Sequence, residues 1–553
     1  MSRFHKRDRL PGIFTTTMVL VVITASCGPV SKPRVPVEFQ TELAGSLLYA
    51  GDRPAAAGHV AGTAEFFLEP PLAIPPLVSL ELEYVSGGTL SYGDAARSAG
   101  KPGGKAGGET DRAAVSFMLP DLPDLTLGGP GTAAFRYTVP LEGDTLGIIR
   151  IAVPGDSALE LSYLGLAGRW YGLDRDERGL RLSPFVVMET PGSVGIEVPE
   201  SFAFPGGADL LIRSGGTVSW TIGNIRFERR GGGEFRVPSG VFPGPAPRVL
   251  VEGDDIRSVR LVPALSRPFP SPIPLDPAMI LSYPVSSWRR EDYEVFRWDA
   301  FPSLLIFDTA DYAVQDRLFK RLAFFVEKAG YRGRLAEDWE IADQHGWNAH
   351  DYRAQDLARF FQAVQLADFP LLPEERELEA LLFDSGIILE DEGRVAPGEG
   401  GIISISRESE SYLRGLFMAH EGFHGVFFID GEFREFSRRR WEGLSSPARR
   451  FILSYFDYQH YDTADEYLMI NEFMAHVLQQ PVSRAAVYFG ETLASRIDAS
   501  PWRRTVLPEK DEAGGNWPVL AEAFLAEAVA FDAYVSGRWG LGAGRVHRIS
   551  VRE

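Results

Sequence analysis

The spacing of apolar residues changes partway along this chain, and that change constrains the fold more than any other feature. Up to about residue 262, short segments such as "VSLELEYV" and "LGIIRIAV" are rich in β-branched and apolar residues and are separated by Gly, Pro, Asp and Ser. Such segments predict β-strands. Many short strands at this spacing predict an all-β sandwich, jelly-roll-like, over residues 41–262.

A proline-rich segment, "SRPFPSPIPLDP", follows and predicts a stiff linker over residues 263–300. Beyond it, apolar residues recur at helical spacing, as in Val314, Leu318 and Leu322. "SLLIFDT" and "GGIISIS" predict two short strands among these helices. Residues 301–553 are therefore predicted to form an α+β domain that is mainly helical. Two domains also suit a chain of 553 residues, which is too long for a single core.

Residues 1–27 have the pattern of an export signal. Basic residues precede the apolar stretch "GIFTTTMVLVVITAS", which is too short to span a bilayer and ends just before Cys27. This resembles a bacterial lipoprotein signal, in which the cysteine is lipidated and becomes the new N-terminus, although Thr24 stands where such signals usually have Leu. The resemblance implies an extracytoplasmic protein anchored to a bacterial membrane at Cys27, with residues 28–40 as a linker. An ordinary secretory signal with an incidental cysteine is the alternative.

Charge and cysteine content restrict the partners. The chain has 75 acidic and 56 basic residues, for a net charge of −19. Nucleic acid is therefore not an expected partner, because phosphate binding needs a surplus of Lys and Arg on one face. Cys27 is the only cysteine, so the chain is expected to fold without internal disulfides.

The run "LFMAHEGFHGVFF" places three ionisable residues in a segment that otherwise predicts a buried helix. His420, Glu421 and His424 form the pattern H-E-x-x-H. Residues four apart lie on one face of a helix, so both imidazoles can point at one metal ion. Glu421 lies about 100° around the helix and can reach a water beside the metal. This pattern resembles the active-site helix of the zincin metallopeptidases.

A hydrolytic zinc site needs a third protein ligand. The metzincin pattern does not supply it, because Phe427 and Asp430 stand where its Gly and His would be. A second predicted helix, "ADEYLMINEFMAHVLQQP", carries Glu472 among apolar neighbours, where an unpaired carboxylate would be costly. Its Asn-Glu-x-x-Ala string resembles the third-ligand helix of several gluzincins, which identifies Glu472 as the third ligand. Asp465 and Glu466 are rival ligands, although both are typical of solvated charges at a helix N-terminus.

The resemblance to the gluzincins implies a function. It implies one Zn²⁺ per chain and a peptidase in which Glu421 takes a proton from metal-bound water as the water attacks a peptide carbonyl. Some gluzincins orient the first histidine with an Asp four residues after the ligand Glu, whereas this chain has His476 there. His476 and Asn471 are the candidates for orienting the metal ligands.

Two further segments contain candidate site residues. "YFDYQHYDTADEY", between the two ligand helices, offers Tyr458, His460 and Tyr461 as donors to the reaction's oxyanion, and we take His460 and Tyr461 as the catalytic candidates. "DQHGWNAHDYRAQD" (343–356) contains a second cluster of polar and aromatic residues: His345, Trp347, Asn348, His350 and Asp351. This segment either lines a substrate cleft or caps a helix, and capping is the favoured interpretation.

Two other functions fit the same sequence. One is a surface lipoprotein whose β-domain binds a glycan or a protein and whose zincin-like domain is degenerate. The retention of Glu421 beside both histidines favours the enzyme over this reading. The other is a zinc amidase acting on a cell-wall linkage, which would use the same metal chemistry. The resemblance covers only residues 416–481 and does not identify the substrate.

Overall fold

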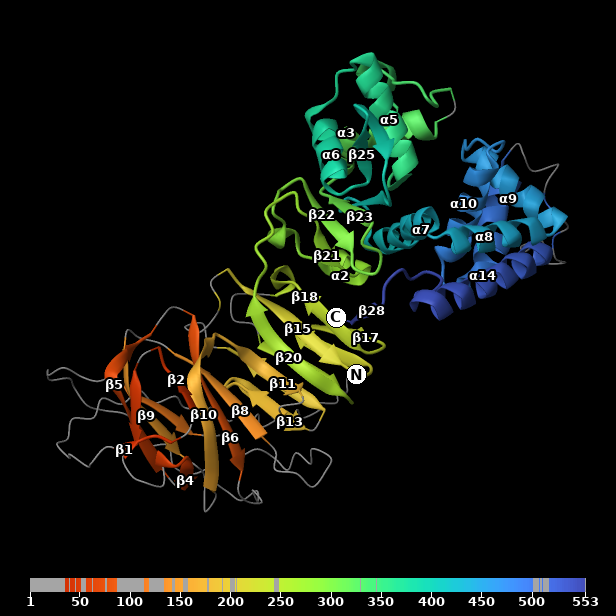
Figure 1. Ribbon diagram of the computed structural model, residues 1–553. Helices are drawn as coiled ribbons and strands as arrows, with labels where there is room; N and C mark the ends of the chain where they lie inside the picture. Colours follow the sequence, from red (N-terminus) through yellow and green to blue (C-terminus); the bar gives the residue numbers. More distant parts are fainter. Residues whose placement is uncertain are drawn as a thin grey trace, which may run out of the picture. The chain divides into compact units, whose positions relative to one another are not determined.

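The chain divides into two compact units in the computed structural model (Figure 1), Met1–Leu265 together with Glu553, and Ser266–Arg552. The structure describes residues 35–552 except for 39, 45, 51–55, 62, 75–76, 87–113, 119–133, 142–144, 153–157, 177–178, 191, 199–203, 205, 243–247, 329, 345, 501–506, 508–509 and 511–516. Among these described residues, no helix is both long enough and apolar enough to cross a lipid bilayer. The predicted export signal, Cys27 and most of the 28–40 linker lie outside them.

The first unit is built from β-strands arranged in sheets. A five-stranded sheet has the order β1 (Val35–Pro36), β3 (Leu47–Ala50), β5 (Thr63–Ala73), β9 (Thr145–Ala152) and β7 (Ala114–Met118). A ten-stranded sheet has the order β18 (Gly233–Val237), β15 (Ala208–Ser214), β20 (Ile256–Pro263), β11 (Tyr171–Asp176), β12 (Gly179–Leu182), β8 (Ala134–Pro140), β6 (Val78–Ser86), β10 (Ala158–Gly168) and β2 (Gln40–Glu42), with β4 (His59–Ala61) paired to β10. A further sheet contains, within this unit, β13 (Val186–Thr190), β14 (Ser193–Glu197), β19 (Arg248–Gly253), β16 (Val218–Ile222) and β17 (Ile225–Arg229) in that order.

Apolar and polar residues alternate along these strands, which explains which side chains are buried. In β6, Leu80 and Leu82 are fully buried, whereas Glu81 between them is half-buried, as expected for a sheet with one apolar face. Across the β16–β17 pair, Trp220 stacks on Phe227 with ring centroids 5.5 Å apart. The predicted β-rich first half of the chain is confirmed at this level. Its arrangement as a jelly-roll-like sandwich stays a prediction.

The second unit is organised around one mixed sheet. Its order is β21 (Ile273–Leu275), β22 (Tyr293–Trp298), β23 (Leu304–Thr309), β27 (Gly401–Ser406) and β24 (His350–Arg353). β23 and β27 are parallel, and β24 is antiparallel to β27 at the edge. Every residue of β23 and β27 is buried, because both faces of these two central strands are covered.

Helices pack on both faces of this sheet. Leu305, Phe307 and Ile402 belong to the core shared with α3 (Tyr312–Val326), α5 (Ala354–Ala367) and α6 (Pro373–Asp384). Strand residues of opposite parity, Leu304 and Ile403, face α7 (Ser411–Ile429), as period-2 alternation requires. Among the described residues of this unit, the remaining elements are α2 (Pro277–Ser282), a 3-10 turn (Val285–Ser287), α4 (Asp338–Ile341), β25 (Ile388–Asp391), β26 (Arg394–Pro397), α8 (Gly431–Gly443), α9 (Ser446–Tyr458), α10 (Glu466–Leu478), α11 (Val482–Val487), a π-helical turn (Tyr488–Leu493), α12 (Ala494–Asp498), α14 (Pro518–Trp539) and β28 (Ile549–Arg552).

The predicted linker over residues 263–300 is wrong for most of its length. β21, α2 and β22 fall within it and belong to the second unit, β21 and β22 as strands of its main sheet. The prolines do not prevent regular structure here, because Pro277 occupies the first turn of α2, where its missing N–H costs nothing. By contrast, the helix predicted from Val314, Leu318 and Leu322 and the strands predicted from "SLLIFDT" and "GGIISIS" are present as α3, β23 and β27.

Asp276 should make the stability of the second unit depend on pH. Its buried carboxylate caps α2 and accepts hydrogen bonds from the backbone N–H groups of Ala278 and Arg548 at 2.9 Å each. Burial raises the pKa of Asp276 to about 7, and the charge of Asp299 adds to the increase. The folded chain therefore holds this proton more tightly than the unfolded chain, where the carboxyl has a pKa of about 4. The contribution is complete below pH 4 or so and is lost, by at most about 4 kcal/mol, as the pH rises toward 7.

Chemical unfolding of Asp299→Asn at pH 5 and pH 8 tests this expectation. Removing the exposed neighbour lowers the pKa of Asp276, so the fall in unfolding free energy between the two pH values should become smaller than in the wild type. Asp391→Asn, which removes an exposed acid from β25, is the matched control and should leave the pH dependence unchanged. An unchanged fall in Asp299→Asn would contradict the assignment.

Candidate metal centre

A buried ion-pair network fixes α7, the helix with the H-E-x-x-H pattern, on the sheet. Arg414 in its first turns donates to both carboxylate oxygens of Asp308 on β23, at 2.8 and 3.1 Å. Arg407 lies 2.6 Å from the same carboxylate. Asp308 is fully buried, and such a carboxylate is tolerated because two guanidinium groups satisfy it. The pairs hold α7 in a defined position against β23.

Two glycines in the same helix allow close packing of its backbone. A Cβ at Gly425 would lie 2.9 Å from a methyl group of Leu304 on β23. A Cβ at Gly422 would lie 3.0 Å from a methyl group of Val546, in the segment that follows α14. Larger residues at these positions would push the helix away from the sheet or from the C-terminal segment. The glycines therefore help to set the depth at which His420 and His424 lie.

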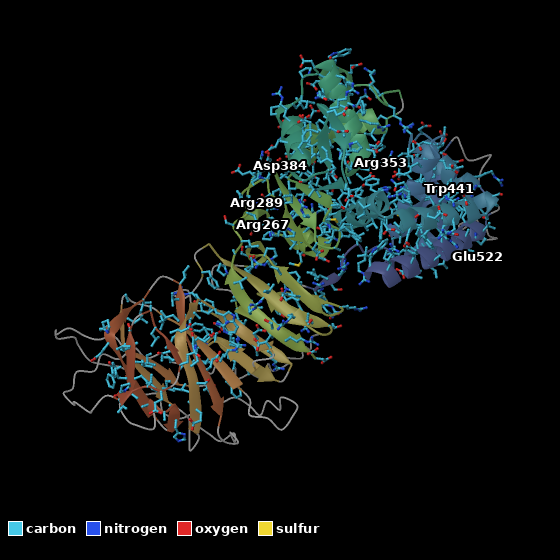
Figure 2. All side chains as sticks on the ribbon, viewed as in Figure 1. Arg267, Arg289, Arg353, Asp384, Trp441 and Glu522 are labelled. Atoms are coloured by element: carbon cyan, nitrogen blue, oxygen red, sulfur yellow. The ribbon has the colours of Figure 1, made fainter. Side chains whose placement is uncertain are left out.

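Contacts on two sides place α10, which carries Glu472. Trp441 of α8 packs on Phe473 with ring centroids 5.4 Å apart, and the guanidinium of Arg353 lies 4.2 Å from the centre of the Tyr467 ring (Figure 2 labels Trp441 and Arg353). Because Arg353 ends β24, it connects the edge of the sheet to the start of α10. α10 thus lies beside both α7 and β24, as its contacts with α7 also show.

His420, His424 and Glu472 converge. The Nε2 atoms of the two histidines are 3.1 Å apart, and the carboxylate oxygens of Glu472 lie 3.7 Å from each of them. Ligand atoms around a tetrahedral zinc ion at normal bond lengths are about 3.4 Å apart, so these distances bracket the expected value. Oε2 of Glu472 is buried and lacks a hydrogen-bond partner among the described residues. The two histidines and the carboxylate could therefore hold a divalent metal ion.

A second group of potential ligands shares His424. Side-chain ligand atoms of Asp351, Glu421 and His424 all lie within 4.8 Å of one another. Nδ1 of His424 is 3.9 Å from Oδ2 of Asp351. Asp351 lies on the edge strand β24, so the sheet edge and α7 together bring its carboxyl next to the predicted general base.

The pKa values in the centre follow from burial and from these neighbours. Burial raises the pKa of Glu421 to about 7, which suits a group that must accept a proton near neutral pH. Burial alone would also raise the pKa of Glu472, but His424 and His420 outweigh it and lower the pKa to about 2. Burial lowers the pKa of His424 to about 4, so its ring is neutral and can act as a ligand. Glu472 is thus ionised, as a metal ligand must be.

Both residues predicted to orient the ligands lie next to them. His476 is nearly buried, with its Nε2 atom 3.9 Å from Oε2 of Glu472 and its ring centre 5.0 Å from that of His420. Asn471 is buried beside His424, close enough to favour the protonated form of that ring. Oδ1 of Asn471 and Nδ1 of His424 are both buried without a partner within normal hydrogen-bond distance among the described residues.

The two candidate oxyanion donors differ in position. The half-buried Tyr461 stacks on Trp347 with ring centroids 5.8 Å apart. Burial raises the pKa of Tyr461 well above its usual value, and the charges of the carboxylates at Glu472, Glu327, Glu421 and Asp351 add to this increase. His460 is exposed and adopts a left-handed conformation with φ 66° in the turn after α9. Tyr458 is also exposed. The arrangement favours Tyr461 as the donor.

The rival ligands have other roles in the structure. Asp465 caps α10 by accepting from the backbone N–H of Leu468 and forms an ion pair with Arg332 at 2.7 Å. Glu466 is exposed in the first turn. Arg332 also pairs with Asp462, at 2.8 Å, so it ties the segment after α3 to the segment that carries Tyr461.

The 343–356 segment contributes more than the favoured capping interpretation allowed. Asp351 and Trp347 both reach the centre, whereas His350 is buried and bonded to the Tyr352 hydroxyl at 2.8 Å through Nδ1. His345 lies outside the described residues. The segment therefore lines the site, and the acid and the indole, not the histidines, are the residues that do so.

Two residues near the centre have no signal in the sequence pattern. Glu327 directly follows α3 and accepts a hydrogen bond from the indole N–H of Trp347 at 2.6 Å. Lys328 places its ammonium 3.2 Å from the centre of the same ring. Burial raises the pKa of Glu327 to about 8, and the charge of Glu472 adds to this increase. Only the fold brings α3 to this site, so local spacing could not reveal these residues.

Comparisons of this chain with models of known protein families, with characterised proteins and with solved structures find no match.

Proposed function

We propose that the second unit is a zinc-dependent peptidase with a zincin-like fold of the gluzincin type. The convergence of His420, His424 and Glu472, with Glu421 adjacent, is the observation that carries this proposal. Two imidazoles and one carboxylate form the ligand set of hydrolytic zinc sites, which leave one position open. One zinc ion per chain would be held by these three residues. When bound, it supplies a Lewis acid that polarises a carbonyl group and acidifies water.

The chain's own residues account for the remaining steps. Glu421 takes a proton from the attacking water and gives it to the leaving amine, a role that its pKa of about 7 supports. Tyr461 keeps its hydroxyl proton and donates to the oxyanion that develops on the substrate. Trp347, stacked on Tyr461, limits the movement of that ring.

The remaining parts of the account are proposals as well. The first unit is proposed to be a β-sandwich that binds a glycan or a protein. Residues 1–27 are proposed to direct export, with Cys27 as the lipid anchor on a bacterial membrane. None of these affects the chemistry at the metal centre.

A peptide-cleavage screen tests the proposed function. We expect the purified chain to cleave members of a mixed peptide library, a chelator to stop cleavage and added zinc to restore it. Cell-wall muropeptides in the same screen distinguish the amidase alternative from the peptidase. If the chain cleaves only muropeptide linkages, its substrates are cell-wall amides and not peptides. A zinc-loaded chain that cleaves neither class would contradict a hydrolytic function.

Tyr461→Phe tests the oxyanion donor. Removing one donor typically lowers kcat by about 10²–10³-fold, and KM and zinc content should change little because Tyr461 is not among the metal ligands. His460→Ala, which removes an exposed side chain of the same segment, is the matched control and should retain nearly full activity. If kcat of Tyr461→Phe stays within about twofold of the wild type, another group stabilises the oxyanion.

A further inference from the structure

Gln479 lies where the metal-binding face of α10 ends. It is the residue that follows α10 and is 5% exposed. It stands seven residues after Glu472, which is two helical turns, so both side chains lie on the same face. Oε1 of Gln479 is 3.0 Å from Nδ1 of His420. A neutral amide therefore occupies the place beside the first histidine.

Two partners on its other side determine how this amide is oriented. Nε2 of Gln479 lies 2.7 Å from the hydroxyl oxygen of Tyr488 and 2.9 Å from Nδ1 of His476. An amide nitrogen has two protons to donate, and the hydroxyl oxygen and an unprotonated Nδ1 can each accept one. His476 then carries its proton on Nε2, which lies 3.9 Å from Oε2 of Glu472. The opposite orientation would require a proton on Nδ1 and would turn a lone pair of His476 toward a carboxylate.

The orientation of the amide fixes the tautomer of His420. Oε1 of Gln479 has no proton, so Nδ1 of His420 must donate to it. A neutral His420 then has its lone pair on Nε2, the atom that lies 3.1 Å from Nε2 of His424 and 3.7 Å from Glu472. This is the tautomer that a metal ligand needs, because the coordinating nitrogen must be unprotonated.

We infer that Gln479 is a positioning residue for a divalent metal, holding His420 in its metal-binding tautomer while His476 and Tyr488 hold the Gln479 amide. This inference rests on the proposed metal centre. It also gives His476 a role. The Gln479 amide takes the place of the orienting carboxylate, and His476 holds that amide in position. Because the amide is neutral, it makes the His420 ring less basic than a carboxylate would.

Zinc affinity of the full chain, measured by competition with a chromophoric chelator, tests the inference. Gln479→Met has a similar length but lacks the strong acceptor, and we expect it to bind zinc about 10–100-fold more weakly. Gln479→Glu keeps an acceptor and should bind zinc at least as tightly as the wild type. Tyr488→Phe removes one partner of the amide and should weaken binding less than Gln479→Met does.

Three outcomes would overturn the inference. They are equal zinc affinity of Gln479→Met and wild type, weaker binding by Gln479→Glu than by Gln479→Met, and a proton on Nε2 instead of Nδ1 of the neutral His420 ring in nitrogen-15 NMR spectra of the zinc-free wild type. The NMR measurement needs no variant, so it decides the question even if Gln479→Met does not fold. If the wild type binds no zinc at all, the proposed function fails before this inference is reached.

Discussion

Replacing Glu421 with glutamine is expected to abolish peptide hydrolysis while zinc stays bound. Glutamine has nearly the same shape as glutamate but cannot accept a proton from water. Losing a general base typically costs about 10²–10⁴-fold in rate. Zinc should remain because Glu421 is not among the three converging ligands, His420, His424 and Glu472. The measurements are kcat/KM for the best peptide of the screen and zinc content per chain.

Glu522→Gln is the matched control for this prediction. Glu522 is exposed on α14 (labelled in Figure 2), so the same chemical change there should leave both activity and zinc content unchanged. Full activity of Glu421→Gln would move the base to another group, and Asp351 would be the next candidate because its carboxyl lies in the same cluster. Loss of zinc along with activity would make Glu421 a ligand instead of a base.

Zinc is also expected to stabilise the chain against heat, and His424→Ala should eliminate this effect. A ligand present at 100 times its dissociation constant stabilises the folded state by about 2.7 kcal/mol. For a unit of this size, that corresponds to an increase in Tm of roughly 5–10 °C. His424 is fully buried between Glu472 and Asp351, so its removal deletes a ligand atom at the centre of the site. Differential scanning calorimetry with zinc and with chelator measures the shift.

Glu466→Gln provides the control for the thermal shift. Glu466 is a rival ligand by sequence but is exposed at the start of α10, so this variant should keep the full zinc-dependent increase in Tm. An increase that persists in His424→Ala would mean that zinc binds elsewhere on the chain. An increase that disappears in Glu466→Gln would restore Glu466 as a ligand.

The spacing of apolar residues predicted the helices and strands more accurately than it predicted the boundary between the two domains. α3, β23 and β27 follow from apolar spacing, because each buries a regular face. The stretch around Pro277 was assigned to a linker because of its prolines, yet the first turn of a helix accommodates proline without loss. Strand β22 was missed within the same stretch, although "YEVFRW" has the residue types of a strand.

The site could be predicted where its residues share one helix and not where the fold brings distant segments together. His420, Glu421 and His424 follow from helical spacing alone, and Glu472 from the cost of a lone buried acid. Gln479 had a usable signal, since it lies two turns after Glu472 on the same face. Asp351 had a signal only as part of the 343–356 segment, which could line a cleft. Glu327 had none, because the residue after α3 approaches α7 only through the packing of the second unit.

The zinc content of the purified chain, compared with that of Glu472→Ala, tests the central claim most directly. The account predicts about one zinc ion per wild-type chain, as in hydrolytic zinc sites. It predicts loss of that zinc in Glu472→Ala, with circular dichroism showing that the variant remains folded. A wild-type chain that takes up no zinc even when zinc is supplied, or a folded Glu472→Ala variant that retains it with unchanged affinity, would contradict the three-ligand centre.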